Sequence, residues 1–308
     1  MNRQVKSDTA SLKRRKRLAV IKTNIGSWIL LLPLVLAVAL VIWYPQALSF
    51  FWSFFDMQGY TPVNFIGLKN YITVFTNTVF PQILGNTVSY VVWSLIIGFI
   101  PPFIVAVMLN EMVHFKSGLK STIYFPAILP GIAVSMMWYL IYFPDTGGLL
   151  NMLLSFVGVE PQEWLQNRTM TIPLMVISMT WRGMPSTMLL YLASLQGINQ
   201  ELYEAATIDG AGFWKKLCKI TLPQMAGLIL IMFVQQIINI FQIMEQPMSM
   251  TGGGPNNASI TMAYWAYKEG FENFRIGPAM AIGNILFVIL VIATSFYFYL
   301  DKKVNDKS

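Results

Sequence analysis

Seven residues at fixed spacing form the most chemically distinctive stretch of this chain. They are Glu204, Ala205, Ala206, Gly210, Ile220, Leu222 and Pro223. The stretch is polar and carries lysines, yet it lies between two long apolar segments. A carboxylate such as that of Glu204 can pair with a basic group, and two adjacent alanines allow another backbone to approach closely. We interpret this stretch as a contact surface for a soluble partner.

A second set of polar residues lies within the apolar segments on either side. It comprises Arg182, Gly183, Ser186, Gln235, Gln236, Asn239 and Gln242. Planar amide and guanidinium groups suit the paired hydroxyls of sugars. Arg182 is a functional candidate because an ionisable residue in a membrane span is costly unless it faces a cavity or a partner. Gly183 and Pro185 weaken the helix beside it, which is tolerated where the backbone lines a cavity.

Structural roles for the same side chains stay open. Glutamine and asparagine within spans often form hydrogen bonds between helices, and Arg182 can pair with another residue for structure, including one in a second subunit. Within the chain, Glu245 is a poor partner for Arg182. A continuous helix from Pro223 places the two residues at depths that differ by roughly 13 Å, at about 1.5 Å per residue.

Patterns for enzymatic chemistry are lacking in the sequence. It contains no Walker A pattern and no Gly-x-Ser-x-Gly pattern. One histidine, His114, and one cysteine, Cys218, cannot form a zinc site unaided. We therefore predict that the chain is not an enzyme and binds no cofactor itself.

The elements that position these residues follow from composition. Of the 308 residues, 55% are apolar and only 11% are charged, against about 25% charged in a typical globular protein. A helix needs about 20 apolar residues to cross a bilayer, and six segments are long enough. The predicted helices are roughly 27–52, 83–109, 121–143, 171–194, 222–246 and 277–300. The sequence therefore predicts an all-α, polytopic membrane protein.

Basic residues predict the orientation of the spans, because cytoplasmic loops are enriched in lysine and arginine. Sixteen of the 21 basic residues lie in the two tails and in the loops after the second and fourth predicted spans, whereas four lie in the other loops. We therefore expect a basic cytoplasmic tail at 1–26, a membrane domain at 27–300, a cytoplasmic loop at 197–221 and a cytoplasmic tail at 301–308.

Local signals predict two helices in the cytoplasmic loop. Asn199 is a plausible N-cap and Glu201 falls in the first turn, where a carboxylate suits the helix dipole. Asp209 and Gly210 form a stop signal, so a helix of two or three turns carries Glu204. A separate amphipathic helix over 213–221 is expected to lie at the headgroup level, before Pro223 begins the next span.

The spacing of the first set resembles a known family signature. Glu-Ala-Ala, three residues, Gly, nine residues, Ile, one residue and Leu-Pro is the signature loop of binding-protein-dependent ABC uptake permeases, and every position matches. The segments Leu202–Tyr203, Ile208–Gly212 and Thr251–Pro255 are similar to those of the carbohydrate branch, the maltose and glycerol-phosphate type. The resemblance implies a type I ABC importer permease fold and a membrane-spanning subunit that carries a carbohydrate into the cytoplasm.

The resemblance also implies partners. The helix with Glu204 would be a coupling helix seated in a groove of a cytoplasmic ATPase dimer, which binds ATP and magnesium. The coupling residues would be Glu204, Ala205, Ala206, Asp209, Gly210, Ile220, Leu222 and Pro223. The other expected partners are a second homologous permease subunit, an extracytoplasmic solute-binding protein and the lipid bilayer, without nucleic acid. The expected location is the plasma membrane of a bacterium or archaeon.

The pathway residues match the family in part. Arg182, Gly183, Ser186, Gln236 and Asn239 match positions that line the sugar site in maltose-type permeases, and Gln235 and Gln242 add hydrogen-bonding capacity nearby. Three positions depart from that pattern. Arg182 replaces an apolar residue, and Ile240 and Ile243 stand where amides can occur. The cargo therefore stays open, with an acidic sugar or a phosphorylated polyol favoured by a cavity arginine. An amino-acid, peptide or ion importer is the alternative.

Overall fold

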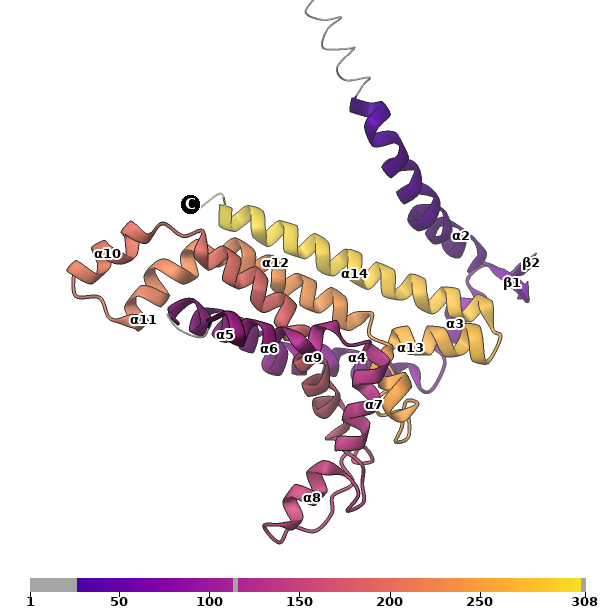
Figure 1. Ribbon diagram of the computed structural model, residues 1–308. Coiled ribbons are helices and arrows are strands. Elements are labelled where there is room, and N and C mark those ends of the chain that lie inside the picture. The colour runs from indigo at the N-terminus through magenta and orange to yellow at the C-terminus, as the bar shows by residue number, and fades with distance from the viewer. Residues whose placement is uncertain (1–26, 113–115, 306–308) are drawn as a thin grey trace, which may run out of the picture.

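The computed structural model describes residues 27–112 and 116–305 (Figure 1). The predicted tail 1–26, the last three residues of the predicted tail 301–308, and His114 lie outside the described residues. Residues 301–305 continue the last helix.

Apart from one hairpin, the regular elements of the described residues are helices. Its elements, with η for a π-helical turn, are η1 Ala39–Trp43, α2 Tyr44–Trp52, β1 Phe55–Gln58, β2 Thr61–Phe65, α3 Lys69–Phe75, α4 Phe80–Trp93, η2 Ser94–Gly98, α5 Ile100–Glu111, α6 Lys116–Ile128, α7 Gly131–Ile141, α8 Leu149–Ser155, α9 Thr171–Gln196, α10 Gln200–Ile208, α11 Phe213–Lys216, η3 Leu217–Thr221, α12 Leu222–Phe241, η4 Pro247–Thr251, α13 Met262–Tyr267, η5 Lys268–Glu272 and α14 Ile276–Asn305. The strands β1 and β2 are antiparallel. The helical fold class is thereby confirmed.

Several of these helices have the length and composition of membrane spans. Within the described ranges, four qualify: Ser27–Trp52, Phe80–Glu111, Phe213–Phe241 and Ile276–Ser295. A bent pair, Gly118–Ile128 with Gly131–Ile141, makes a fifth if it counts as one span. Helix α9 is 26 residues long but less apolar, because it carries Arg182 and several hydroxyl side chains. The total of six spans stays a prediction.

The segment 121–143, expected as one helix, differs from the prediction. It is divided into α6 and α7, which are bent by 96° relative to each other. Pro130 lies at the break with φ −56° and ψ 135°, outside the helical region. Proline donates no backbone hydrogen bond and disfavours the helical conformation of the preceding residue. Helix α6 therefore ends at Ile128, and the chain turns over Leu129 and Pro130.

The segment around Pro223 also differs. The expected headgroup-level helix over 213–221 and the span that follows form one continuous helix, Phe213–Phe241. Pro223 lies in the first turn of α12, directly after the π turn η3, and such turns accommodate interruptions of the helical hydrogen-bond ladder. The helix ends at Phe241, so the expected end at 246 was too late.

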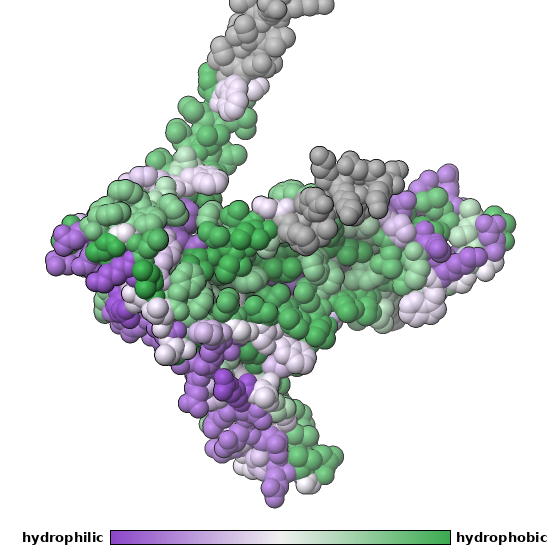
Figure 2. Space-filling view, turned by 180° about the vertical axis from the view of Figure 1, so that it is seen from behind, coloured by the Kyte–Doolittle hydropathy of each residue, from purple (hydrophilic) through white to green (hydrophobic). Residues whose placement is uncertain are grey.

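The core forms where the long helices meet. Met188, Tyr191 and Leu192 of α9 pack with Ala106 of α5 and Met225 of α12, and all five are at most 2% exposed. Figure 1 shows α5, α9, α12 and α14 running alongside one another, while the helix Ser27–Trp52 stands apart. Figure 2 shows hydrophobic residues over the middle of this bundle and hydrophilic ones towards its ends, as expected for a protein whose solvent is partly lipid.

One buried asparagine organises the loop between α7 and α9. Asn151 is fully buried in α8. Its amide nitrogen donates to the carbonyls of Phe143 (3.1 Å), Pro144 (2.8 Å) and Gln162 (3.0 Å). Its amide oxygen accepts from the Trp164 indole at 2.8 Å and from the Gln162 backbone at 3.0 Å. A single side chain thus satisfies the backbone of two separate loop segments.

Replacing Asn151 by leucine is expected to loosen this loop. The change leaves several buried polar groups unpaired, at about 1–3 kcal/mol each. Hydrogen exchange should rise by at least tenfold over residues 144–165 and stay unchanged in α9. The neighbouring exposed Ser155, changed to alanine, is the control. Equal exchange in the Asn151 and Ser155 variants contradicts the role assigned to Asn151.

Candidate functional site

The helix that carries Glu204 is defined by local signals at both ends. Asn199 caps its start, with the side-chain oxygen accepting from the Glu201 backbone N–H at 3.0 Å. Gly210 ends it with φ +72°, a left-handed conformation that glycine adopts without a steric penalty. The predicted cap, short helix and stop are all confirmed. Helix α10 lies at one end of the bundle, together with α11 (Figure 1).

Two polar contacts and a small apolar cluster connect α10 to α11 and η3, the segment that leads into α12. The Tyr203 hydroxyl lies 2.9 Å from the Thr221 hydroxyl, and the Lys216 ammonium donates to the Thr207 hydroxyl at 2.8 Å. Tyr203 and Ile220 also pack against the core cluster of α5, α9 and α12. These contacts hold α10 against the helix that follows it.

The outer face of α10 is left to solvent. Glu204, Ala205 and Asp209 are exposed, as are Gly210 and Pro223, whereas Ala206, Ile220 and Leu222 are half-buried. Ile208 is an apolar side chain with 88% exposure. Exposed apolar groups beside a carboxylate are typical of an interaction surface.

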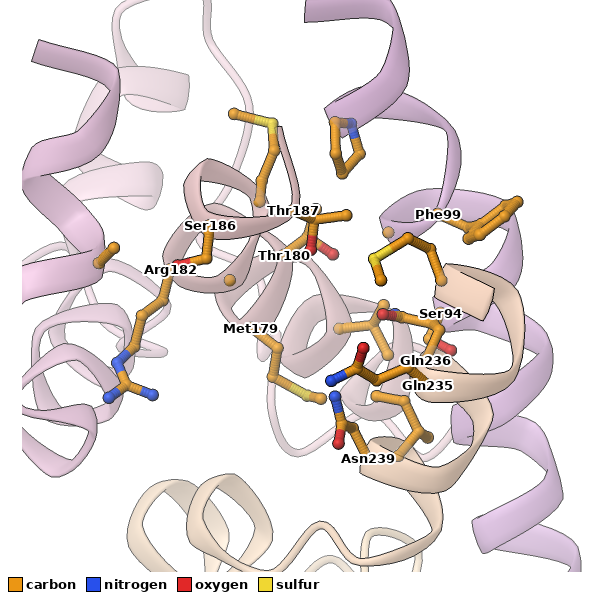
Figure 3. Close-up of a pocket in the computed structure, with 18 of the residues that line it drawn as sticks. Ser94, Phe99, Met179, Thr180, Arg182, Ser186, Thr187, Gln235, Gln236 and Asn239 are labelled. Atoms are coloured by element: carbon orange, nitrogen blue, oxygen red, sulfur yellow. The ribbon is translucent and has the colours of Figure 1, made fainter. Parts of the chain in front are cut away.

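A cavity of about 420 Å³ lies between η2, α9 and α12. Six of the seven predicted pathway residues line it: Arg182, Gly183, Ser186, Gln235, Gln236 and Asn239. The structure adds three hydroxyl residues, Ser94, Thr180 and Thr187, that the sequence analysis missed. Figure 3 shows the amides of Gln235, Gln236 and Asn239 gathered on one side of the cavity and the hydroxyls of Thr180 and Thr187 on another.

Gly98 lets two of these polar side chains converge. A Cβ at this position would lie 2.9 Å from the Thr180 hydroxyl oxygen and 3.1 Å from the Gln236 amide nitrogen. Gly98 ends the π turn η2, two residues before the start of α5 and its paired prolines. The irregular turn and the missing side chain together open room for donors and acceptors within an apolar bundle.

Arg182 points away from the amide cluster. Figure 3 shows its side chain directed to the opposite side, and its Nε donates to the Leu129 carbonyl at 3.2 Å. The guanidinium group therefore contacts the break between α6 and α7, although Arg182 is also among the residues that line the cavity.

The seventh predicted residue, Gln242, borders a different pocket. This pocket has a volume of about 400 Å³ and is also lined by Arg182, Gly183 and Glu245. Helix α12 ends at Phe241, so Glu245 does not continue it as the sequence suggested. The continuous helix on which the expected depth difference between Arg182 and Glu245 rested is therefore absent, and both residues line this one pocket.

The sequence matches one family of membrane transport components and relatives named as sugar permeases. The family described as "Binding-protein-dependent transport system inner membrane component" matches residues 99–306. The chain is 33% identical over 266 residues to the arabinooligosaccharides transport system permease protein of Bacillus subtilis (strain 168), covering 85% of this chain and 84% of that protein. It is 30% identical over 281 residues to the trehalose/maltose transport system permease protein of Thermococcus litoralis (strain ATCC 51850 / DSM 5473 / JCM 8560 / NS-C), covering 91% and 94%.

A solved structure shares the fold. The chain resembles one chain of a bacterial alginate ABC transporter, crystallised in complex with an alginate pentasaccharide-bound periplasmic protein, with a TM-score of 0.80 and 22% identity. The match covers 93% of this chain and 97% of that one. At this level of identity the likeness establishes the fold alone.

Proposed function

The chain belongs to the family of binding-protein-dependent transport system inner membrane components, and on that premise we propose that it is the membrane-spanning permease subunit of an importer that moves a carbohydrate into the cytoplasm. Members of this family are permease subunits of ABC transporters and are not enzymes themselves. The family and the apolar helices make the chain a multi-pass membrane protein.

The lining of the cavity between η2, α9 and α12 is the main reason to propose a carbohydrate as the cargo. Three amides and four hydroxyls line it together with apolar residues such as Phe99 and Met232, and a polyhydroxylated ligand pairs with such donors and acceptors. The relatives from Bacillus subtilis and Thermococcus litoralis are named for sugars as well. An importer of amino acids, peptides or ions is not favoured by these observations.

The energy would come from a separate cytoplasmic ATPase dimer that binds ATP and magnesium. The exposed face of α10 supports this part of the proposal, because it offers a carboxylate and small side chains to a partner. In this account Glu204, Ala205, Ala206, Asp209 and Gly210 contact the ATPase. Ile220, Leu222 and Pro223 connect that contact to α12.

Two further partners complete the proposed assembly. A second homologous permease subunit would share the translocation pathway, and an extracytoplasmic solute-binding protein would deliver the sugar. The alginate transporter of similar fold was crystallised with a periplasmic protein. The location would be the plasma membrane of a bacterium or archaeon.

Uptake assays test the proposal. Cells that lack the chain are expected to lose ATP-dependent uptake of a labelled oligosaccharide, and the chain supplied in trans should restore it. A panel of neutral oligosaccharides, acidic oligosaccharides and amino acids identifies the class. Loss confined to amino acids would replace the proposal with its alternative.

A further inference from the structure

Two charged residues of opposite sign occupy otherwise uncharged segments. Arg182 is the only charged residue between Arg168 and Glu201, and Glu245 is the only one between Lys219 and Lys268. An isolated charge in a span is costly unless it finds a partner. Both residues line the same pocket, and each contacts a different side of the α6–α7 break.

Arg182 meets the end of α6. Its Nε donates to the carbonyl of Leu129 at 3.2 Å, directly after the last residue of α6. The final carbonyls of a helix lack partners within the helix and carry a partial negative charge. The next residue is Pro130, which has no N–H to offer. A cation at this position satisfies a carbonyl that the break has freed.

Glu245 meets the beginning of α7. Gly131 is the first residue of α7, and a side chain there would overlap the Glu245 carboxylate. The first turn of a helix carries a partial positive charge, so a carboxylate is favourable there. The negative residue thus faces the positive helix end and the positive residue faces the negative one, and the arrangement is neutral as a whole.

We propose that Arg182 and Glu245 form a clamp that holds the α6–α7 break in its bent form. They act as positioning residues rather than as a recognition site for an acidic cargo. The break matters for transport because Ala127 of α6 lines the polar cavity and Arg182 lines both pockets. The bend therefore sets the position of one cavity wall. This consequence rests on the proposed function, whereas the clamp itself does not.

The clamp predicts a specific pattern among charge-neutralising variants. Removing one charge leaves the other without compensation in a poorly solvated place, whereas removing both is milder. Residues that act as one unit give effects that do not add. Arg182→Met and Glu245→Gln are therefore each expected to be more harmful than the double variant.

The experiment uses the full chain assembled with its partner subunits, in a Cys218→Ser background, with Leu129→Cys as a reporter. Cys218 is a free, exposed thiol and is removed so that only position 129 reacts. Each single variant is expected to change the labelling rate at position 129 by roughly tenfold, and the double variant should stay within about threefold of the parent. Uptake of neutral and acidic oligosaccharides should likewise fall more in each single variant than in the double variant.

Gly131→Ala tests the clamp without changing a charge. The added methyl group displaces the Glu245 carboxylate, whose side chain can swing away. This variant should reproduce the labelling change of Glu245→Gln and add nothing to it when the two are combined.

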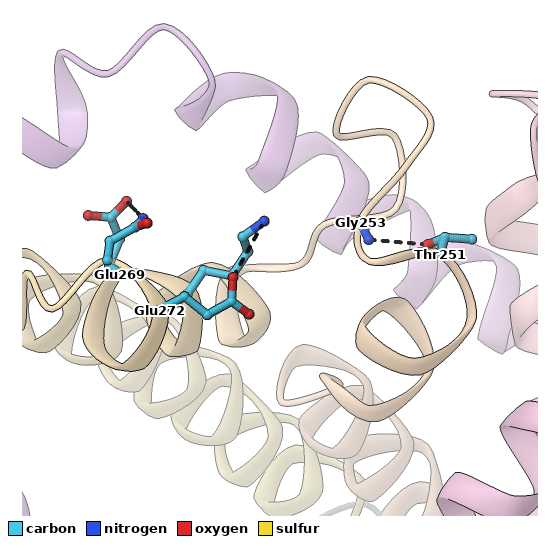
Figure 4. Close-up of polar contacts among 6 residues, drawn as sticks. Thr251, Gly253, Glu269 and Glu272 are labelled. Carbon is cyan, nitrogen blue, oxygen red and sulfur yellow. Dashed lines mark hydrogen bonds and ion pairs between the residues drawn. The ribbon is translucent and has the colours of Figure 1, made fainter.

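Arg275→Met is the matched control. It breaks another arginine–glutamate pair, in which Arg275 Nη1 lies 3.1 Å from Glu269 Oε2, in the segment before α14. Figure 4 shows the contacts of Glu269. This variant should leave the labelling of position 129 unchanged.

The outcomes separate the possibilities. If Arg182→Met abolishes uptake of acidic oligosaccharides alone while Glu245→Gln has no effect, Arg182 binds cargo and the clamp is overturned. If neither single variant changes labelling, the clamp is overturned as well. If labelling follows the predicted pattern but no sugar is transported by the parent, the clamp stands and the proposed function fails.

Discussion

Replacing Glu204 by lysine is expected to abolish sugar uptake while the chain still folds and inserts. Glu204 is exposed on α10, so its own burial does not stabilise the permease. In the assembled transporter it would face a basic group of the ATPase. Reversing the charge sets two like charges against each other, at about 2 kcal/mol or more. Uptake should therefore fall by roughly 30-fold or more, to near the background level.

Co-purification and uptake measure this effect together. The Glu204→Lys chain should be present in the membrane at the normal level but recover much less ATPase subunit. Glu160→Lys makes the same change of charge at an exposed position in the loop between α8 and α9, and it should preserve both assembly and uptake. Normal assembly and uptake in the Glu204 variant contradict the assigned role of α10.

The double variant Gln236→Ala with Asn239→Ala is expected to lose uptake with its assembly intact. Both amides line the cavity, and Gln236 approaches Thr180 across Gly98. Each hydrogen bond lost to a sugar hydroxyl weakens binding by about 0.5–1.5 kcal/mol. Two amides make several such bonds, so uptake at low sugar concentration should fall by roughly 100-fold.

Stability distinguishes sugar binding from contacts between helices. The double variant should keep the thermal midpoint of the purified transporter and its recovery of the ATPase subunit. Gln224→Ala, an exposed glutamine in the first turn of the same helix, is the control and should transport normally. A fall in thermal midpoint that matches the loss of uptake assigns the amides to structure instead.

The coupling loop was predictable because its signals are local. A capping asparagine, a first-turn glutamate and a glycine stop define α10 without reference to any distant residue, and the structure has the helix where these signals place it. The cavity positions of the α12 amides, and of Gly183 and Ser186 in α9, were also predictable, since such residues are conspicuous in an apolar run.

The cavity hydroxyls were not predictable in the same way. Serine and threonine in a helix can bond to a carbonyl of their own preceding turn, as Ser94 does to Val91 at 2.8 Å. Their presence in a span therefore says little about a cavity. Only the packing of η2 against α9 and α12 shows that Ser94, Thr180 and Thr187 border the same space.

The bend of the third predicted span depends on distant contacts. Pro130 marks the position of the break in the sequence, but an apolar run with a proline is also compatible with a mild kink. The bend of 96° brings the break against Arg182 of α9 and Glu245 beyond α12. Those contacts are tertiary, and the contact of Glu245 occurs beyond the end of α12 at Phe241.

A photo-crosslinking amino acid at position 204 gives the most direct test of the central claim, that ATP hydrolysis on another polypeptide drives this chain through α10. In the assembled transporter, illumination should join position 204 to the ATPase subunit, and ATP should change the yield. The same probe at position 160 should give no such product. Crosslinking of position 204 to lipid or to an extracytoplasmic protein, with none to a nucleotide-binding subunit, would contradict the account.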